Sequence, residues 1–481
     1  MNIALSLIYT LCKEKKHELF VLFTTNGDYY PWWQKIRIKE SVKVLASLGL
    51  PEDKIIYLGY GDRWLGDKHI YNREAKEECI CHSLRRETAG YGRVQDYRYK
   101  KSGYHSKFTR ENYLNDFKDA IYDVKADVII CTDFDRHDEH RALTLFFDEA
   151  MCALIKDKNY RPIVLKKFAY ASVFEGVDDY YSYPFKPTEP PIKNLLNDDR
   201  FETDVPQYRW NDRIRLKVDD DLKKIPLRGS YIFSVSKLYR SQLMANRLWY
   251  MINDDAVYWW RNTKGLQYNA EIEASSGNAA YLNDFKYIDC SDIYPTYGTI
   301  KMFDRCVWSP EEDDSKKEFT MTFASPKDIG EIILFENFDP ESNIGDMEVC
   351  FDNGYFFHTG ELNHDGSASV FTFEKQTSIS RITFKLIEIS GPMPGLTEVE
   401  VYESHQSFQY DNEVLVKYEE GESAVNVIPR WRVKLERFLI NAGYQITLFL
   451  SPWNLVENIR ERSYNHMILK KYDSHQRSTN Q

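Results

Sequence analysis

The sequence predicts an α/β domain followed by an all-β sandwich. Over residues 1–265, short apolar runs alternate with amphipathic helical patterns, which is typical of a mostly parallel, doubly wound sheet with helices on both faces. From residue 296 onward the pattern changes to short β runs separated by turn residues, which is typical of an antiparallel sandwich. We therefore divide the chain into a domain at 1–265, a linker at 266–295, a sandwich at 296–404 and a helical extension at 405–481.

The chain begins with a helical pattern where such a sheet normally begins with a strand. Residues 3–11 are apolar, with no basic residue before them and no small-residue cleavage site after them, so we predict a helix packed on the sheet and not a signal peptide. Residues 18–24 predict the strand that follows. A doubly wound sheet normally starts with a strand that feeds the first helix, and the sequence lacks that strand.

The later elements alternate in the same way, with turn and capping residues at their limits. Thr109, for example, is a typical N-cap for the helix after it. In the first domain we predict helices at 37–48, 109–124, 142–155 and 234–253, strands at 128–130, 165–173 and 213–218, and an extended proline-containing segment at 184–206. In the sandwich we predict strands at 319–323, 331–335, 347–351, 369–373, 381–386 and 398–402.

Composition limits the class of protein and its partners. With 481 residues, of which 43% are hydrophobic, the chain can build two or three sizeable cores. The net charge of -11 is spread without a basic stripe, which argues against nucleic acid as a partner. The 8 cysteines are scattered and several lie in apolar contexts, so we expect buried free thiols and a cytoplasmic location.

The extension at 405–481 contains an apolar stretch at 438–456 that polar residues and a proline interrupt. A membrane span is therefore not expected. We favour a packed helix pair or a helix that faces a partner. A helix lying on a membrane surface, flanked by arginines such as Arg432 and Arg460, is the less favoured alternative.

One polar loop is the strongest candidate for chemistry. It runs from Asp135 to His140, after the apolar run 128–130 and before a helix. Because polar groups at the carboxyl ends of strands gather at one edge of an α/β sheet, His137 and His140 can converge there on a metal. The alternative is a solvated charged turn that caps the helix.

The surrounding residues favour the metal interpretation. The segment from Asp135 to Arg141 fits the pattern D-x-H-x-D/E-H-R and resembles the second metal motif of the PIG-L/LmbE superfamily, whose members are zinc-dependent de-N-acetylases of N-acetylglucosamine-type sugars. Further stretches resemble that family in the same order along the chain: 23–28, 37–40, 58–62 and 239–242. The resemblance covers roughly the first 265 residues and implies a Rossmann-like α/β fold.

The resemblance also implies roles for individual residues. His140 would be a zinc ligand, and His137 would stand near the developing oxyanion as an electrostatic stabiliser or acid, with Asp135 fixing its tautomer. Asp28, Arg37 and Asp62 would face sugar hydroxyls at the rim of the pocket. Alternatively, Arg37 and Glu40 are a helix pair of structural value only.

The family's first metal motif, H-P-D-D-E, would fall just ahead of Met1 and is not in the sequence. One remaining ligand, His140, cannot hold zinc tightly, so we expect weak metal binding and little hydrolysis. Either the chain begins too late, through a misplaced start or truncation, or this member has lost its catalytic half, and two functions from different classes follow. The first is a metal-dependent hydrolase that removes N-acetyl groups from N-acetylglucosamine-type sugars or glycoconjugates. The second is a non-catalytic glycan-binding or assembly protein on a degenerate deacetylase scaffold.

The sandwich resembles a galactose-binding-like (discoidin, F5/8 type C) domain. The resemblance rests on Trp308-Ser-Pro310 with Asp304, on the run 329–334 and on the closing run 395–402. It implies a glycan partner bound by loops at one end of the sandwich. Aromatic residues at 355–357 could stack on a sugar, although aromatic residues in sandwich strands are more often part of the core.

Overall fold

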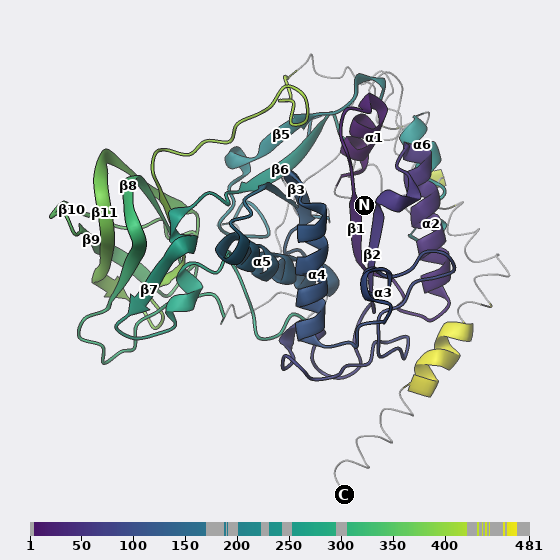
Figure 1. Cartoon of the computed structure of the whole chain (residues 1–481), viewed down its shortest axis with the longest axis horizontal. Coiled ribbons are helices and arrows are strands. Elements are labelled where there is room, and N and C mark those ends of the chain that lie inside the picture. Colours follow the sequence, from purple (N-terminus) through teal and green to yellow (C-terminus); the bar gives the residue numbers. More distant parts are fainter. Residues whose placement is uncertain are drawn as a thin grey trace, which may run out of the picture.

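The computed structural model divides the chain into an N-terminal α/β part and a β-sandwich beside it (Figure 1). It describes residues 4–169, 187–188, 190, 201–222, 230–242, 253–294, 305–420, 431, 435, 438–439, 442, 456 and 459–468. Most of the predicted segment 184–206, the ends of the predicted strand 165–173 and helix 234–253, and nearly all of 421–458 lie outside these residues. No helix in the described ranges is long and apolar enough to cross a membrane.

The N-terminal part alternates helices and strands, as predicted. The helices are α1 (Leu5–Glu14), α2 (Trp33–Leu48), α3 (Tyr97–Ser102), α4 (Arg110–Val124), α5 (Asp138–Lys158) and α6 (Tyr231–Ser236). The strands are β1 (Val21–Thr25), β2 (Ile55–Tyr60), β3 (Val128–Thr132), β4 (Ile163–Lys167), β5 (Ile214–Lys217) and β6 (Asp255–Arg261).

These strands form two sheets, whereas the sequence predicts one mostly parallel sheet. β1 and β2 form a parallel pair, and the second sheet has the order β3-β4-β6-β5. Within it β3 and β4 are parallel, but β6 is antiparallel to both of its neighbours, β4 and β5. A continuous parallel sheet is therefore not present in the described ranges, because no described strand joins β1 to β3.

The two sheets nevertheless share the same two apolar cores. Leu58 of β2 and Val164 of β4 pack in one core with α4 and α5. Tyr57 and Leu165, their neighbours in sequence, pack in the other core with α1 and α2. Because side chains alternate between the faces of a strand, this shared alternation places both sheets in one layer with helices on each face.

Local capping explains where the helices around the predicted site begin. The Thr109 hydroxyl accepts a hydrogen bond from the Asn112 backbone N–H at 3.1 Å, which confirms the predicted cap of α4. The His137 ring plays the same role for α5, since its Nδ1 accepts from the Glu139 N–H at 3.2 Å. As a result, α5 begins at Asp138, so the second half of the predicted loop 135–140 is the first turn of a helix.

The sandwich consists of β7 (Ala270–Ala274), β8 (Glu318–Glu336), β9 (Asn343–Phe351), β10 (Phe356–His358), β11 (Ala368–Ser390) and β12 (Leu396–Tyr402). These six strands form one continuous sheet, and its two longest strands, β8 and β11, each run through both halves of it. Their segments at 318–323 and 381–390 pair with each other, and β7 and β9 flank them. The other segments, at 329–336 of β8 and 368–376 of β11, pair with each other, and β12 pairs with this segment of β8. This confirms the antiparallel sandwich.

The predicted linker at 266–295 is wrong, because part of it is built into the sandwich. β7 pairs with residues 319–323 of β8. The alternation of Ala270, Ile272 and Ala274 with glutamates is a short strand pattern that the flanking turn residues obscure.

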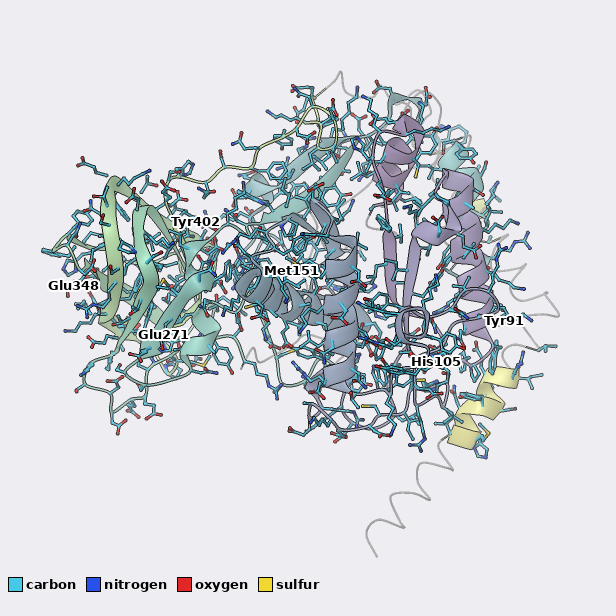
Figure 2. All side chains as sticks on the ribbon, in the orientation of Figure 1. Tyr91, His105, Met151, Glu271, Glu348 and Tyr402 are labelled. Carbon is cyan, nitrogen blue, oxygen red and sulfur yellow. The ribbon has the colours of Figure 1, made fainter. Side chains whose placement is uncertain are left out.

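A buried ion pair joins the two parts. Arg261, the last residue of β6, donates to Glu400 of β12 and lies over the Tyr287 ring, 3.7 Å from its centroid. Tyr287 and Tyr402 also donate to Glu400, at 3.1 and 2.6 Å. Figure 2 shows Tyr402 on the side of the sandwich that faces the N-terminal part, and Glu348 on the opposite side.

Candidate functional site

A cavity of about 1050 Å³ runs between β1 and β3, and the predicted site lies at one end of it. All residues of both strands line the cavity. The end beyond the carboxyl termini of the strands, which we call the polar end, is lined by Asn26, Arg37, Asp62, Arg63, His137, Asp138, Glu139, His140 and Gln242. Four of the six predicted site residues therefore meet there: Arg37, Asp62, His137 and His140.

Asp135 is fully buried and fixes the loop after β3. Its carboxylate accepts the backbone N–H of His137 at 2.9 Å and that of Ala169 at 3.0 Å. The His140 ring Nδ1 lies 2.9 and 3.0 Å from the two carboxylate oxygens. The sequence predicts that Asp135 fixes the tautomer of His137, but the structure pairs Asp135 with the ring of His140.

This pair changes the acidity of both residues. Burial alone would lower the pKa of His140, but the Asp135 carboxylate more than offsets it, so the pKa of His140 is raised. Burial would raise the pKa of Asp135, but the His140 charge and the hydrogen bonds lower it. The arrangement therefore favours an imidazolium paired with a carboxylate at the polar end.

The ring of His137 has a structural role at the start of α5. Its ring stacks on that of His140, with the centroids 4.8 Å apart, and its Nδ1 caps α5. Burial, and next the neighbouring His140 charge, lower the pKa of His137. Burial and the repulsion between two adjacent imidazolium groups thus both favour the neutral form of His137.

Asp62 is an unusual carboxyl group at the polar end. It pairs with Arg37 at 3.2 Å, yet burial, followed by the charge of Glu139, raises its pKa to about 7. The Arg37 guanidinium also lies over the Trp33 ring, 4.3 Å from its centroid. A carboxyl group that titrates near neutral pH can act either as a hydrogen-bond donor or as an acceptor toward a ligand.

Asp28 does not line the cavity. Its fully buried carboxylate accepts from Arg85 Nε at 2.9 Å, from the Ser83 hydroxyl at 2.5 Å and from the Asp62 backbone N–H at 3.0 Å. It therefore holds the loop after β2 in place and does not face a substrate. The sequence could not indicate this, because Ser83 and Arg85 are more than fifty residues away.

The segments 37–40 and 239–242, far apart in the sequence, lie in contact beside the polar end. Ser241 donates to the Glu40 carboxylate from its backbone and its hydroxyl, and the Tyr239 hydroxyl lies 2.7 Å from that of Ser41. The side-chain oxygen of Gln242 faces Arg37 and accepts a hydrogen bond from the Arg37 Nε–H at 3.0 Å. Residues 239–242 thus pack against α2 and hold the Arg37 side chain of that helix in place.

Glu139 of the polar end and His69 next to it were not among the predicted site residues. Glu139 accepts the Arg63 backbone N–H at 2.7 Å, and its carboxylate lies 3.2 Å from Nε2 of the buried His69. The Arg63 contact connects the loop after β2 with the first turn of α5. The position of Glu139 between two histidines was a signal for a site residue, whereas nothing local marked His69.

The described residues do not fit a zinc site. They contain no group of three or more His, Cys, Asp or Glu side chains that could hold a metal ion. A catalytic zinc needs three protein ligands, and the Asp135 carboxylate that could supplement His140 is already engaged by His140 and two backbone N–H groups.

A second candidate surface lies on the sandwich. Four half-buried rings, which we call the aromatic surface, cover the buried Phe351 between the edges of β10 and β11: Tyr355, Phe357, Phe371 and Phe373. The Phe357 centroid lies 5.6 and 5.4 Å from those of Phe371 and Phe373. Phe356 points to the opposite face and is 57% exposed.

Comparisons with known proteins concern the sandwich. Residues 267–402 match a domain of unknown function, DUF7402. No curated protein matches the chain.

Similar solved structures include CpGH89CBM32-5 from Clostridium perfringens in complex with GalNAc-β-1,3-galactose, at 14% identity, covering 28% of this chain and 97% of that one, with a TM-score of 0.21. The family 32 CBM from C. perfringens NanJ in complex with galactose is 12% identical. The match covers 28% of this chain and 95% of that one, with a TM-score of 0.21. Chitosan-binding module 1 from a Paenibacillus sp. IK-5 chitosanase/glucanase is 15% identical. The match covers 29% of this chain and 98% of that one, with a TM-score of 0.20.

Proposed function

We propose that this protein binds glycans and that its sandwich, a galactose-binding-like module, recognises them. The observation that carries the proposal is the aromatic surface. Its rings are only half-buried although they border a packed core, so they offer apolar faces to a ligand at the open side of the sandwich. The Asn353 and Gln376 side chains, hydrogen-bonded at 3.0 Å between the β9–β10 turn and β11, supply polar groups nearby.

Titration calorimetry with galactose, N-acetylgalactosamine and N-acetylglucosamine oligosaccharides tests this function. Phe357→Ala should weaken binding about tenfold or more, equivalent to ~1.4 kcal/mol. Phe356→Ala is the matched control, because it removes an exposed ring from the same strand on the opposite face. Equal binding by wild type and Phe357→Ala, or equal loss in both variants, would refute the aromatic surface as the binding site.

A second candidate is hydrolysis at the polar end of the cavity, in the manner of the PIG-L/LmbE superfamily. The Asp135–His140 pair supports it, because a charged imidazole beside a cavity can donate a proton to a leaving amine. Arg37 and Asp62 could position an N-acetylated sugar. Since the described residues lack a zinc ligand set, we assign no step to a metal.

Acetate release from N-acetylglucosamine oligosaccharides measures this activity, and saturation-transfer NMR measures binding of the same sugars. His140→Ala should abolish acetate release and leave sugar binding largely intact. Binding with no acetate release by the wild-type chain would instead support a non-catalytic glycan-binding protein.

A further inference from the structure

A second cavity, of about 240 Å³, lies where the N-terminal part meets the sandwich, and we call it the junction pocket. Its lining residues fall within 201–211 of the N-terminal part, with one more, Asp365, from the connection between β10 and β11. None of them belongs to the polar end or to the aromatic surface. The junction pocket is therefore a separate candidate site.

The buried lining residues form an apolar floor. Phe201 and Tyr208 are each 7% exposed, and Pro206 between them is also buried. The Tyr208 ring stacks on that of Trp259 in β6, with the centroids 5.9 Å apart. From the sandwich side, the Phe338 ring meets Phe201 edge to face at 6.0 Å. Because both parts of the molecule hold this floor, the pocket is preformed.

A close backbone contact places the sandwich residue at the pocket. Gly366 has a φ of +78°, and a Cβ there would lie 3.0 Å from Cβ of Pro206 and 2.9 Å from Cβ of Phe338. The turn therefore lies directly on the floor, as only glycine permits, and the preceding residue, Asp365, reaches the rim.

The rim of the junction pocket is polar and has unused binding groups. Arg209 and Asp365 pair at 3.0 Å. Glu202 accepts the Trp210 backbone N–H at 2.6 Å, but within the described ranges no cation pairs with its carboxylate. The exposed Asn211 amide likewise has no hydrogen-bond partner among these residues. Two carboxylates and one guanidinium line the pocket, so its net charge is -1.

We propose that the junction pocket binds one residue of an amino sugar with a free amine, such as glucosamine. Its ammonium group would pair with Glu202, its hydroxyls would bond with Asn211 and with the Arg209–Asp365 pair, and its C–H face would lie on the apolar floor. This inference rests on the proposed glycan-binding function and adds a second subsite to it.

Other sugars match the pocket less well. A neutral or N-acetylated sugar has no cation for Glu202, so it would lack the charge-assisted hydrogen bond. An anionic sugar would meet a pocket of net negative charge, in which the guanidinium of Arg209 is already paired with Asp365. The charge of the pocket therefore selects an amine.

Titration calorimetry of the full chain with a trisaccharide of glucosamine tests the proposal, and the trisaccharide of N-acetylglucosamine is the neutral counterpart. Glu202→Gln keeps an acceptor for the Trp210 N–H and should weaken binding of the amino sugar at least tenfold, with binding of the neutral sugar unchanged. Glu312→Gln is the control, because it alters an exposed carboxyl group outside the pocket, and it should change neither affinity. Absence of amino-sugar binding by the wild type, or equal affinities in wild type and Glu202→Gln, would overturn the proposal.

Two further variants separate this inference from the proposed function. Asn211→Ala removes an exposed amide that bonds to nothing else in the described residues, so any loss of amino-sugar affinity reports a ligand contact. We expect at least a threefold loss, and an unchanged affinity would overturn the placement. Phe357→Ala should weaken only the neutral sugar. Loss of amino-sugar binding in Phe357→Ala but not in Glu202→Gln would assign that sugar to the aromatic surface and overturn the junction pocket. Amino-sugar binding that depends on Glu202, with no binding of neutral sugars, would refute the aromatic surface alone.

Discussion

At the residue scale, the site depends on Asp135. This one buried carboxylate holds the ring of His140, the backbone of His137 and the backbone of Ala169, so it links β3, α5 and the segment after β4. Its charge also raises the pKa of His140, whereas burial and the His140 charge lower the pKa of His137. The pKa values of two histidines three residues apart are thus shifted in opposite directions.

We predict that the pKa of His140 lies above that of a free histidine, about 6.5, and that Asp135→Asn lowers it below that value because only the effect of burial remains. Histidine NMR titration measures both. A His140 pKa that is equal in the two proteins would contradict the pairing.

Asp62 should give the stability of the chain a pH dependence opposite in sign to that from a carboxylate with a lowered pKa. Its pKa is about 7 in the folded chain and about 3.8 when unfolded, so the folded chain binds an extra proton between these values. The free energy of unfolding should therefore fall as pH rises from about 4 to 7, and level off above that. In Asp62→Asn this component should be absent, as urea unfolding at pH 5, 6, 7 and 8 would reveal.

Part of the site could be predicted from the sequence. The strand, polar loop and helix around Asp135 are contiguous in the chain, so the meeting of His137 and His140 at the end of β3 follows from local pattern. The burial of Asp28 could not be predicted, because it depends on Arg85, and the pairing of His69 with Glu139 depends on a contact between distant loops. To predict the cap formed by His137, the start of α5 would have to be known to within one residue.

At the element scale, β8 and β11 differ most from their prediction. The sequence predicts separate strands at 319–323 and 331–335, whereas β8 is one strand from Glu318 to Glu336. Residues 324–328 contain serine and proline, which are turn signals when considered locally. Pairing with β11 keeps them in the strand, which is a tertiary effect that local propensity cannot reveal.

Gly391, after β11, and Gly354, in the turn between β9 and β10, are a matched pair of glycines. Gly391 and Gly354 both have positive φ, 85° and 89°. A Cβ at Gly391 would lie 1.9 Å from the Glu341 carbonyl oxygen, but one at Gly354 would meet nothing within 4 Å. We expect Gly354→Ala to cost ~1–2 kcal/mol, from backbone strain alone. Gly391→Ala should cost clearly more, by thermal or urea unfolding, and equal costs would contradict the close approach.

At the scale of the whole molecule, the N-terminal part and the sandwich are joined by buried charge. Burial raises the pKa of Glu398 well above its usual range, which leaves Glu400 as the carboxylate that compensates Arg261. The sequence predicts the two folds but not this contact, because Arg261 lies at the end of one predicted domain and Glu400 within the other. Because the sequence predicts a linker between the two domains, it provides no reason to expect a contact between Arg261 and Glu400.

Arg261→Met should therefore destabilise the chain by ~3–5 kcal/mol, since it leaves a buried carboxylate without its cation. Adding Glu400→Gln should recover much of the loss. Arg209→Met is the control, because the Arg209–Asp365 pair at 3.0 Å also joins the two parts but is exposed, and its loss should cost no more than ~1 kcal/mol. Calorimetry of the four proteins distinguishes these outcomes, and similar costs for both arginines would contradict the buried pair.

The placement of β7 determines how the sandwich could be excised as a portable module. A fragment starting at residue 296 would strip β7 from the Phe319–Phe323 edge of β8. Such a bare edge recruits strands from other molecules, so that fragment should precipitate or form fibres. Cutting upstream of Gln267 would keep the edge covered, although the surface around Glu400, now facing water, would still need redesign.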